Sequence, residues 1–277
     1  MAPDARPTRI LHVSDLHIGS RDVPELVAPL EALIEATAPE LVIASGDLTH
    51  RGRPAQHARA AAFLKGLSPN VFAIPGNHDI PYNWRRVITP WREFERHWTT
   101  TQPLYTSPTL HVVGLNSVRP WRHQSGRLRR RQLAHAHSEL AGAAPGALRV
   151  VVLHHHLLGA PWRSRKRPVK DRNRVLGALV ESGAELILAG HIHQGTVAER
   201  REFEVSTGGE RGVTVSIAPG LGQPRPHRRG EARGLHLYDV GEAHLRVSTY
   251  VWRDGEWGLT ALRRFPRGAE PLAGDPT

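Results

Sequence analysis

Short apolar runs that end abruptly in polar residues recur along the first two-thirds of the chain. They cover residues 9–14, 41–44, 71–74, 110–116, 149–153 and 186–189. Apolar positions at helical spacing, or alanine-rich composition, predict helices between several of these runs. The predicted helices cover residues 23–37, 55–66, 128–141 and 173–183. Strands that alternate with helices are typical of parallel βαβ units, so the sequence predicts an α/β fold whose strands end at a common edge.

The pattern changes from about residue 196, where short or alternating apolar runs lie between turn residues. These runs cover residues 213–217, 234–240, 244–252 and 257–262. They predict antiparallel strands that complete the sheet or pack against it. Because no clear linker interrupts the chain, we expect a single domain over residues 1–277, with a motif-bearing βα part at 8–195 and mostly antiparallel strands at 196–265. Residues 1–7 and 266–277 are expected to be frayed ends.

Composition narrows the kinds of chemistry that are available to the chain. A hydrophobic content of 39% and a charged content of 23% over 277 residues are ordinary for a globular protein. The chain has no cysteine, which excludes disulfides and thiolate metal sites, so any metal must bind His, Asp, Glu, Asn or water. A polar N-terminus and the absence of any run approaching about 18 apolar residues predict neither a signal peptide nor a membrane span. We therefore expect a cytoplasmic location.

Basic residues dominate the charge, which is +11. This balance favours phosphate-bearing partners, although an arginine-rich composition accounts for it equally well. Residues 163–174 follow a triple histidine and either overhang the site to bind phosphate or form a solvated loop. Residues 119–131, which include Trp121 and His123, either support nucleotide stacking or form a surface turn and helix. Residues 81–104, which contain three tryptophans, predict a helical segment that caps the site.

Five of the apolar runs are followed by side chains that can bind a metal or carry a proton. These side chains are Asp15 and His17, Asp47, Asn77 and His78, His154, and His191 and His193. Each group alone has a plain structural explanation, such as a helix cap, a turn or a chance histidine pair. Five of them make coincidence a poor explanation, because parallel strands bring their carboxyl ends to one crevice. Carboxylate, imidazole and amide ligands together suit Mn, Fe or Zn.

In chain order the motifs read Asp-x-His, Gly-Asp, Gly-Asn-His-Asp, His-His-His and Gly-His-x-His. This series resembles the calcineurin-like metallophosphoesterase superfamily and is most similar to its bacterial cyclic-nucleotide phosphodiesterase-like branch. The resemblance implies a metallophosphoesterase-type β-sandwich flanked by helices, with the metal site at the strand carboxyl ends. It further implies two ions, one bound by Asp15, His17, Asp47 and His193, and one bound by Asp47, Asn77, His154 and His191. His154 is preferred because it directly ends the apolar run, and His155 is the alternative.

The resemblance also implies a reaction. Two ions about 4 Å apart hold a phosphoryl group, and a hydroxide that bridges them attacks phosphorus in line with the leaving oxygen. His78 faces the substrate, where it protonates the leaving group or stabilises the transition state, and Asp79 orients it. We expect a phosphodiesterase that acts on a cyclic nucleotide or another small phosphodiester. A DNA nuclease of the same fold and a non-catalytic scaffold are the alternatives, and nothing in the sequence indicates an oligomeric state.

Overall fold

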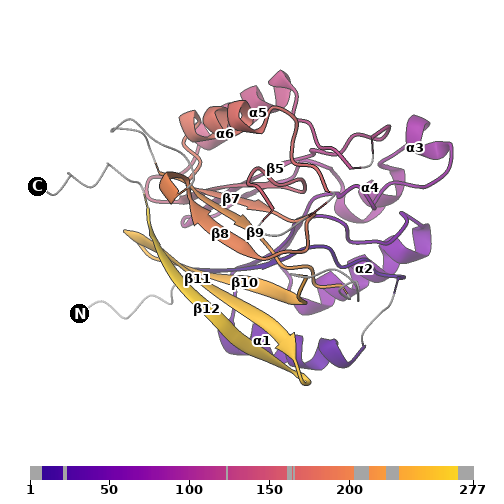
Figure 1. The fold of residues 1–277 in the computed structure, drawn as a ribbon, viewed down its shortest axis with the longest axis horizontal. Helices are drawn as coiled ribbons and strands as arrows, with labels where there is room; N and C mark the ends of the chain where they lie inside the picture. The colour runs from indigo at the N-terminus through magenta and orange to yellow at the C-terminus, as the bar shows by residue number, and fades with distance from the viewer. Residues whose placement is uncertain are drawn as a thin grey trace, which may run out of the picture.

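The computed structural model describes residues 8–20, 24–122, 124–160, 164, 166–202, 212–222 and 231–267. Two six-stranded sheets lie face to face, and helices cover their outer faces (Figure 1). Helices α1 (Val27–Thr37) and α2 (Pro54–Leu67) lie outside the first sheet. Helices α5 (Arg130–Ala141) and α6 (Arg172–Glu181) lie outside the second sheet. The predicted β-sandwich flanked by helices is confirmed.

The first sheet joins the N-terminal strands to the C-terminal ones, in the order β12-β11-β10-β1-β2-β3. Its strands are β1 (Thr8–Val13), β2 (Leu41–Ala44), β3 (Val71–Ala73), β10 (Gly234–Val240), β11 (His244–Arg253) and β12 (Glu256–Pro266). The pairs β1–β2 and β2–β3 are parallel, whereas β1–β10, β10–β11 and β11–β12 are antiparallel. Residues 1–7 and 268–277 of the expected frayed ends lie outside the described residues.

The second sheet has the order β4-β5-β6-β7-β9-β8. Its strands are β4 (Leu104–Thr106), β5 (Leu110–Leu115), β6 (Leu148–Leu153), β7 (Leu186–Ala189), β8 (Thr196–Glu199) and β9 (Thr214–Ile217). The expectation that the run at 213–217 is antiparallel is only half right, because β9 pairs in parallel with β7 and antiparallel with β8. Strand β8 supplies the antiparallel partner, and its four residues are too short a run for the sequence pattern to reveal.

The remaining helices are short. A 3-10 turn, η1 (Pro24–Leu26), precedes α1, and a second, η2 (Arg200–Glu202), follows β8. The segment expected to be helical at 81–104 contains α3 (Arg85–Ile88) and α4 (Arg92–Trp98), and its last residue begins β4. In the described part of the chain, no helix has the length and apolar character required to cross a bilayer. The cytoplasmic location stays a prediction.

Three apolar layers hold the sheets and helices together. The middle layer lies between the two sheets and includes Ile10, Ile43, Val150, Leu188 and Tyr238, all fully buried. An outer layer packs α1 and α2 on the first sheet, and another packs α5 and α6 on the second. Strands buried on both faces explain why the apolar runs are nearly continuous rather than alternating.

The carboxyl ends of β1, β2 and β3 meet those of β6 and β7 at the same end of the sandwich. The backbone N–H of Asp15 donates to the carbonyl of Gly46 at 2.9 Å, which joins the β1 and β2 ends. The backbone N–H of His191 donates to the carboxylate of Asp15 at 2.9 Å, which joins the β7 end to them. The motifs therefore converge from two sheets, rather than from one sheet edge as the βαβ pattern predicts.

Candidate metal centre

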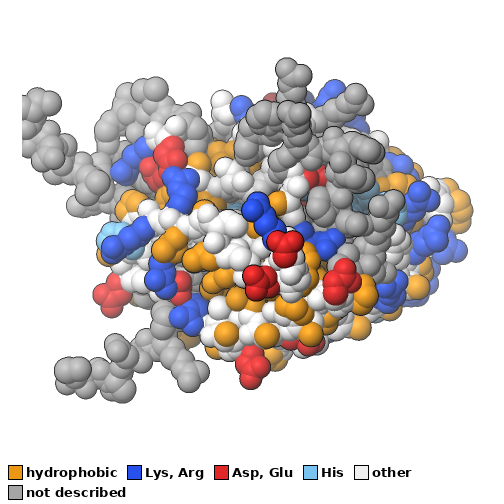
Figure 2. Space-filling model, turned by 60° about the horizontal axis from the view of Figure 1, so that its bottom comes forward, with side chains coloured by type: hydrophobic (Ala, Val, Ile, Leu, Met, Phe, Trp, Pro, Cys, Tyr) orange, Lys and Arg blue, Asp and Glu red, His pale blue; other side chains and the backbone are white. Residues whose placement is uncertain are grey.

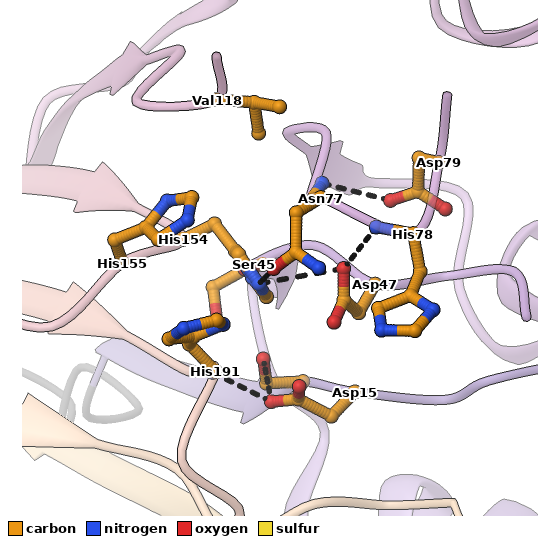
Figure 3. Close-up of polar contacts among 12 residues, drawn as sticks. Asp15, Ser45, Asp47, Asn77, His78, Asp79, Val118, His154, His155 and His191 are labelled. Carbon is orange, nitrogen blue, oxygen red and sulfur yellow. Dashed lines mark hydrogen bonds and ion pairs between the residues drawn. The ribbon is translucent and has the colours of Figure 1, made fainter. Parts of the chain in front are cut away.

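The predicted ligands lie together where the two sheets meet. Asp15 and His17 follow β1, Asp47 follows β2, Asn77 follows β3, His154 follows β6, and His191 and His193 follow β7. All are buried except His17, which is partly exposed. Figure 3 shows Asp15, Asp47 and His191 pointing into one space between these strand ends. Residues spread over nearly two-thirds of the chain are thus gathered by the fold.

One group of side chains that could hold an ion consists of Asp15, His17 and His193. The Nε2 atom of His193 lies 2.9 Å from Oδ1 of Asp15, and Nε2 of His17 lies 3.1 Å from Nε2 of His193. One ligand atom from each of the three residues lies within 4.8 Å of the others. The ligand types and spacing suit a transition metal.

A second group consists of Asp47, His154 and His191, with Asn77 beside it. The Nε2 atom of His154 lies 3.4 Å from Oδ1 of Asp47 and 3.2 Å from Oδ1 of Asn77. The other ring nitrogen of His154 donates to the backbone carbonyl of Ser45 at 2.9 Å. That bond requires a proton on Nδ1, so Nε2 is the ring nitrogen that faces the ligand cluster. Many metal-binding histidines are oriented in this way.

Asp47 lies between the two groups. Its Oδ2 atom is 3.8 Å from Nε2 of His17, whereas its Oδ1 atom is 3.4 Å from Nε2 of His154. One carboxylate oxygen therefore faces each group. The Oδ1 atom also accepts the backbone N–H of His78 at 2.7 Å, which fixes the carboxylate in this orientation.

Several buried polar atoms here have no hydrogen-bond partner among the described residues. They are Oδ2 of Asp47 and both ring nitrogens of His191. A buried donor or acceptor left unpaired costs about 1–3 kcal/mol, so such atoms are rare in native interiors. A bound cation would satisfy them, and the residues present therefore fit a metal.

The backbone is strained at the same positions. Five of the nine described non-glycine residues with positive φ are predicted ligands: Asp15 (54°), His17 (48°), Asp47 (52°), His191 (75°) and His193 (58°). Left-handed conformations are uncommon for residues other than glycine, and such strain concentrates at functional sites. Close approach also explains two motif glycines, because a Cβ on Gly76 would collide with Asp47 and one on Gly190 would collide with Ser14.

Burial and the neighbouring charges set the ionisation of the ligands. Burial would raise the pKa of Asp47, but His154 beside it holds that pKa well below its usual range. Burial would lower the pKa of His154, and the Asp47 carboxylate raises it to about 9. Burial, with His155 nearby, keeps the pKa of His191 well below its usual value. An ionised carboxylate beside a neutral imidazole is ready for a cation, and His154 must release its proton when it binds one.

His154 and His155 of the triple histidine contact different partners. His154 faces Asp47 and Asn77, whereas Nδ1 of His155 lies 2.9 Å from the hydroxyl of Ser117. The His155 ring packs 4.5 Å from the His191 ring, centroid to centroid. His154 thus faces the second group and His155 lies behind His191, and the choice of His154 as the ligand stays a prediction.

Polar contacts position both His78 and Asp79. The Nδ1 atom of His78 donates to the carbonyl of His50 at 2.9 Å and also lies 2.9 Å from the hydroxyl of Tyr82. The carboxylate of Asp79 accepts backbone N–H groups of Leu48, Thr49 and Gly76. These bonds tie the loop after β2 to the loop after β3. His50 and Tyr82 therefore orient the His78 ring, a role that the sequence motif did not suggest for them.

The basic segment at 163–174 reaches the centre through one side chain. The ammonium of Lys166 donates to the carbonyl of His191 and lies 2.9 Å from Nε2 of His193. Lys166 is buried, which is unusual for a lysine. Arg163 and Arg165 of this segment lie outside the described residues. Sequence reasoning identified the segment as a phosphate-binding candidate, but its many basic residues gave no reason to single out this lysine.

The family model described as calcineurin-like phosphoesterase matches residues 8–195, and the chain belongs to that family. It is a metal-dependent phosphohydrolase. A probable cyclic nucleotide phosphodiesterase of Rhodococcus erythropolis is 27% identical over 258 residues, which is 87% of this chain and 84% of the relative. A 3',5'-cyclic adenosine monophosphate phosphodiesterase of Vibrio vulnificus is 27% identical over 207 residues, which is 67% of this chain and 70% of the relative.

Among solved structures, a dimetal phosphatase from Danio rerio superposes with a TM-score of 0.66 at 14% identity. The match covers 95% of this chain and 100% of the Danio rerio chain. At that identity the likeness shows the fold alone, and the fold agrees with the two-sheet architecture described above.

Proposed function

We propose that the protein is a dinuclear metal-dependent phosphodiesterase that hydrolyses small phosphodiesters, with cyclic nucleotides as the first candidates. The observation that carries the proposal is the Asp47 carboxylate, which directs one oxygen at each of two ligand groups. The relatives named as cyclic nucleotide phosphodiesterases support the substrate class.

In this proposal one ion is held by Asp15, His17, Asp47 and His193, and the other by Asp47, Asn77, His154 and His191. Two such ions supply Lewis acidity and activate water as the nucleophile, and Mn, Fe or Zn would suit these ligands. Asp47 contributes to both sites.

His78 is the proposed proton donor to the leaving oxygen. Its ring packs edge-on against His17 with centroids 4.8 Å apart, which places it beside the first ligand group. Because Nδ1 is bonded to the carbonyl of His50, the proton available to a substrate is the one on Nε2. Asp79 acts indirectly, since its bonds hold the loop that carries His78.

Lys166 is the proposed contact for a non-bridging phosphate oxygen. Its ammonium already lies against the first ligand group, and a cation there would favour an anionic phosphoester.

The test uses metal-stripped protein supplied with Mn and a panel of bis-p-nitrophenyl phosphate, cyclic AMP, glycerophosphodiesters and single-stranded DNA. We expect turnover of the first two. His78→Ala should retain two ions per chain and lose about 10²–10⁴-fold in kcat, the usual contribution of a general acid. His137→Ala, which removes an exposed histidine on α5, is the matched control.

No turnover of any diester would overturn the proposal, and turnover confined to DNA would favour the nuclease alternative. Loss of metal in His78→Ala would move that residue among the ligands.

A further inference from the structure

A cavity of about 600 Å³ lies beside the metal centre, between the α3–α4 segment and the start of α5. The guanidinium-bearing residues that line it are Arg119, Arg127, Arg129 and Arg131, and Trp91 and Trp121 line it as well. No Asp or Glu is among the described residues of its lining. The cavity is thus strongly cationic and partly aromatic.

Residues next to the cavity lining contact His155, at the back of the metal centre. Val118 lines the cavity. The neighbouring Ser117 bonds the ring of His155 on the side of the centre. Gly126, next to Arg127, packs so tightly on the His155 ring that a Cβ there would clash with it. The cavity therefore lies behind His155, whose ring packs against that of His191.

Some arginines elsewhere in the protein are neutralised by a carboxylate. Arg9, Arg263 and Arg267 each form an ion pair with a carboxylate, at 2.7, 2.7 and 3.3 Å. The four cavity arginines form no ion pair with any carboxylate in the described part of the chain. Figure 2 likewise shows acidic and basic side chains interspersed over much of the face that it draws. What distinguishes the cavity is that four arginines without a carboxylate partner among the described residues line the same hollow.

We propose that this cavity binds a phosphorylated nucleotide portion of the substrate, remote from the phosphodiester that is cleaved. Guanidinium groups bind phosphate oxygens with paired N–H donors, and indole rings stack on nucleobases. Trp121 is 65% exposed, so its face is open to such a base. The inference rests on the proposed function and extends it: a nucleotide diester that carries a further phosphate gains this contact, whereas a cyclic mononucleotide is hydrolysed without it.

The test measures binding rather than turnover. The probe is adenosine 5′-(α,β-methylene)diphosphate, titrated calorimetrically into the metal-loaded full chain at fixed ionic strength. We expect Arg129→Gln combined with Arg131→Gln to weaken binding at least about tenfold, since each lost charge-assisted contact matters. Arg130→Gln is the matched control, because Arg130 is exposed on the same helix between them and does not line the cavity; it should weaken binding less than about twofold.

Trp121→Ala should weaken the same probe several-fold and remove part of the fluorescence quenching that accompanies binding. Metal content and circular dichroism confirm that each variant is folded. Adenosine, which has no phosphate, should bind far more weakly than the probe to the unmodified protein.

The inference is overturned if the unmodified protein does not bind the probe at millimolar concentration, or if the double variant binds it normally. It is also overturned if a single-stranded oligonucleotide binds more tightly and is weakened equally by Arg130→Gln, which would indicate a general charged surface. Hydrolysis of bis-p-nitrophenyl phosphate is measured in parallel. Absence of hydrolysis would contradict the proposed function, whereas the binding result would still show whether the cavity binds a phosphorylated nucleotide.

Discussion

Two polar clusters lie buried between the sheets, and they differ in whether their polar atoms have hydrogen-bond partners. In one, Nε2 of His12 lies 2.8 Å from the hydroxyl of Ser45, and its Nδ1 lies 3.3 Å from the hydroxyl of Tyr238. The Tyr238 hydroxyl donates to Ser216 at 2.7 Å, and Ser216 lies 3.0 Å from Nδ1 of His236. Each member of this network has a partner within it.

The other cluster is the metal centre, where Asp47 and His191 keep atoms without a hydrogen-bond partner among the described residues. Five of its seven predicted ligands also have strained backbones, whereas none of the network residues has a positive φ. Two clusters of similar side chains and similar burial therefore have different roles, one structural and one as a candidate metal centre. Burial and histidine content do not distinguish a functional cluster from a structural one, but unmet hydrogen-bonding capacity and backbone strain do.

The largest expected effect comes from Asp47→Ala, which removes the group shared by both ligand sets. We expect both ions and at least about 10³-fold of turnover to be lost together. Metal analysis and bis-p-nitrophenyl phosphate hydrolysis measure the two quantities. A variant that kept two ions per chain at normal turnover would remove Asp47 from its bridging position.

The second-largest expected effect is that acid lowers the free energy of unfolding by protonating the His12–Tyr238–Ser216–His236 network. Burial lowers the pKa of His236 from 6.5 to about 3, so the unfolded chain binds more protons between these values. The contribution of His236 to stability should therefore be constant above pH 7 and fall below about pH 6.5, by up to about 1.4 kcal/mol per pH unit. Urea denaturation of metal-free protein from pH 7.5 to 4.5 measures the slope. His236→Gln should reduce that slope, while His12, whose pKa burial also lowers, keeps part of it. Equal slopes for the two proteins would show that His236 is not kept neutral by the fold.

Tyr238→Phe gives the smallest effect. It leaves Ser216 without its donor, so unfolding should become about 1–2 kcal/mol easier, with metal content unchanged. Tyr250→Phe is the control, because no described residue bonds that hydroxyl. A large loss of metal in Tyr238→Phe would mean that the two clusters act as one, through the Ser45 carbonyl that accepts a bond from His154.

Much of the centre was predictable because the motifs carry both the ligand types and the strand ends that place them. The apolar runs before Asp15, Asp47 and His154 are strands in the structure, and each of these residues lies within three positions of its strand end. The convergence of two sheets was not predictable, since the βαβ rhythm is the same whether successive strands join one sheet or two. Pairing is decided by contacts between residues far apart in the chain, such as Thr8 with Val240.

The groups around the motifs were harder to predict. Tyr82 contacts His78, and Lys166 contacts His193. Both residues lie in loops, whose conformation cannot be predicted from the spacing of apolar residues. The role expected for Asp79 illustrates the same limit. Its place beside His78 in the chain suggested a partner, but the turn directs its carboxylate to the backbone of Leu48 and Thr49.

Because both sheets contribute ligands, bound metal would affect the unfolding of the protein. Ions held by Asp15 and Asp47 on one side, and by His154 and His191 on the other, would act as cross-links between the two halves of the sandwich. By mass action, an ion present at a hundred times its dissociation constant adds about 2.7 kcal/mol to the free energy of unfolding. The melting temperature would then report metal occupancy, and the supply of metal in the cell would set how long the chain survives as well as how fast it works.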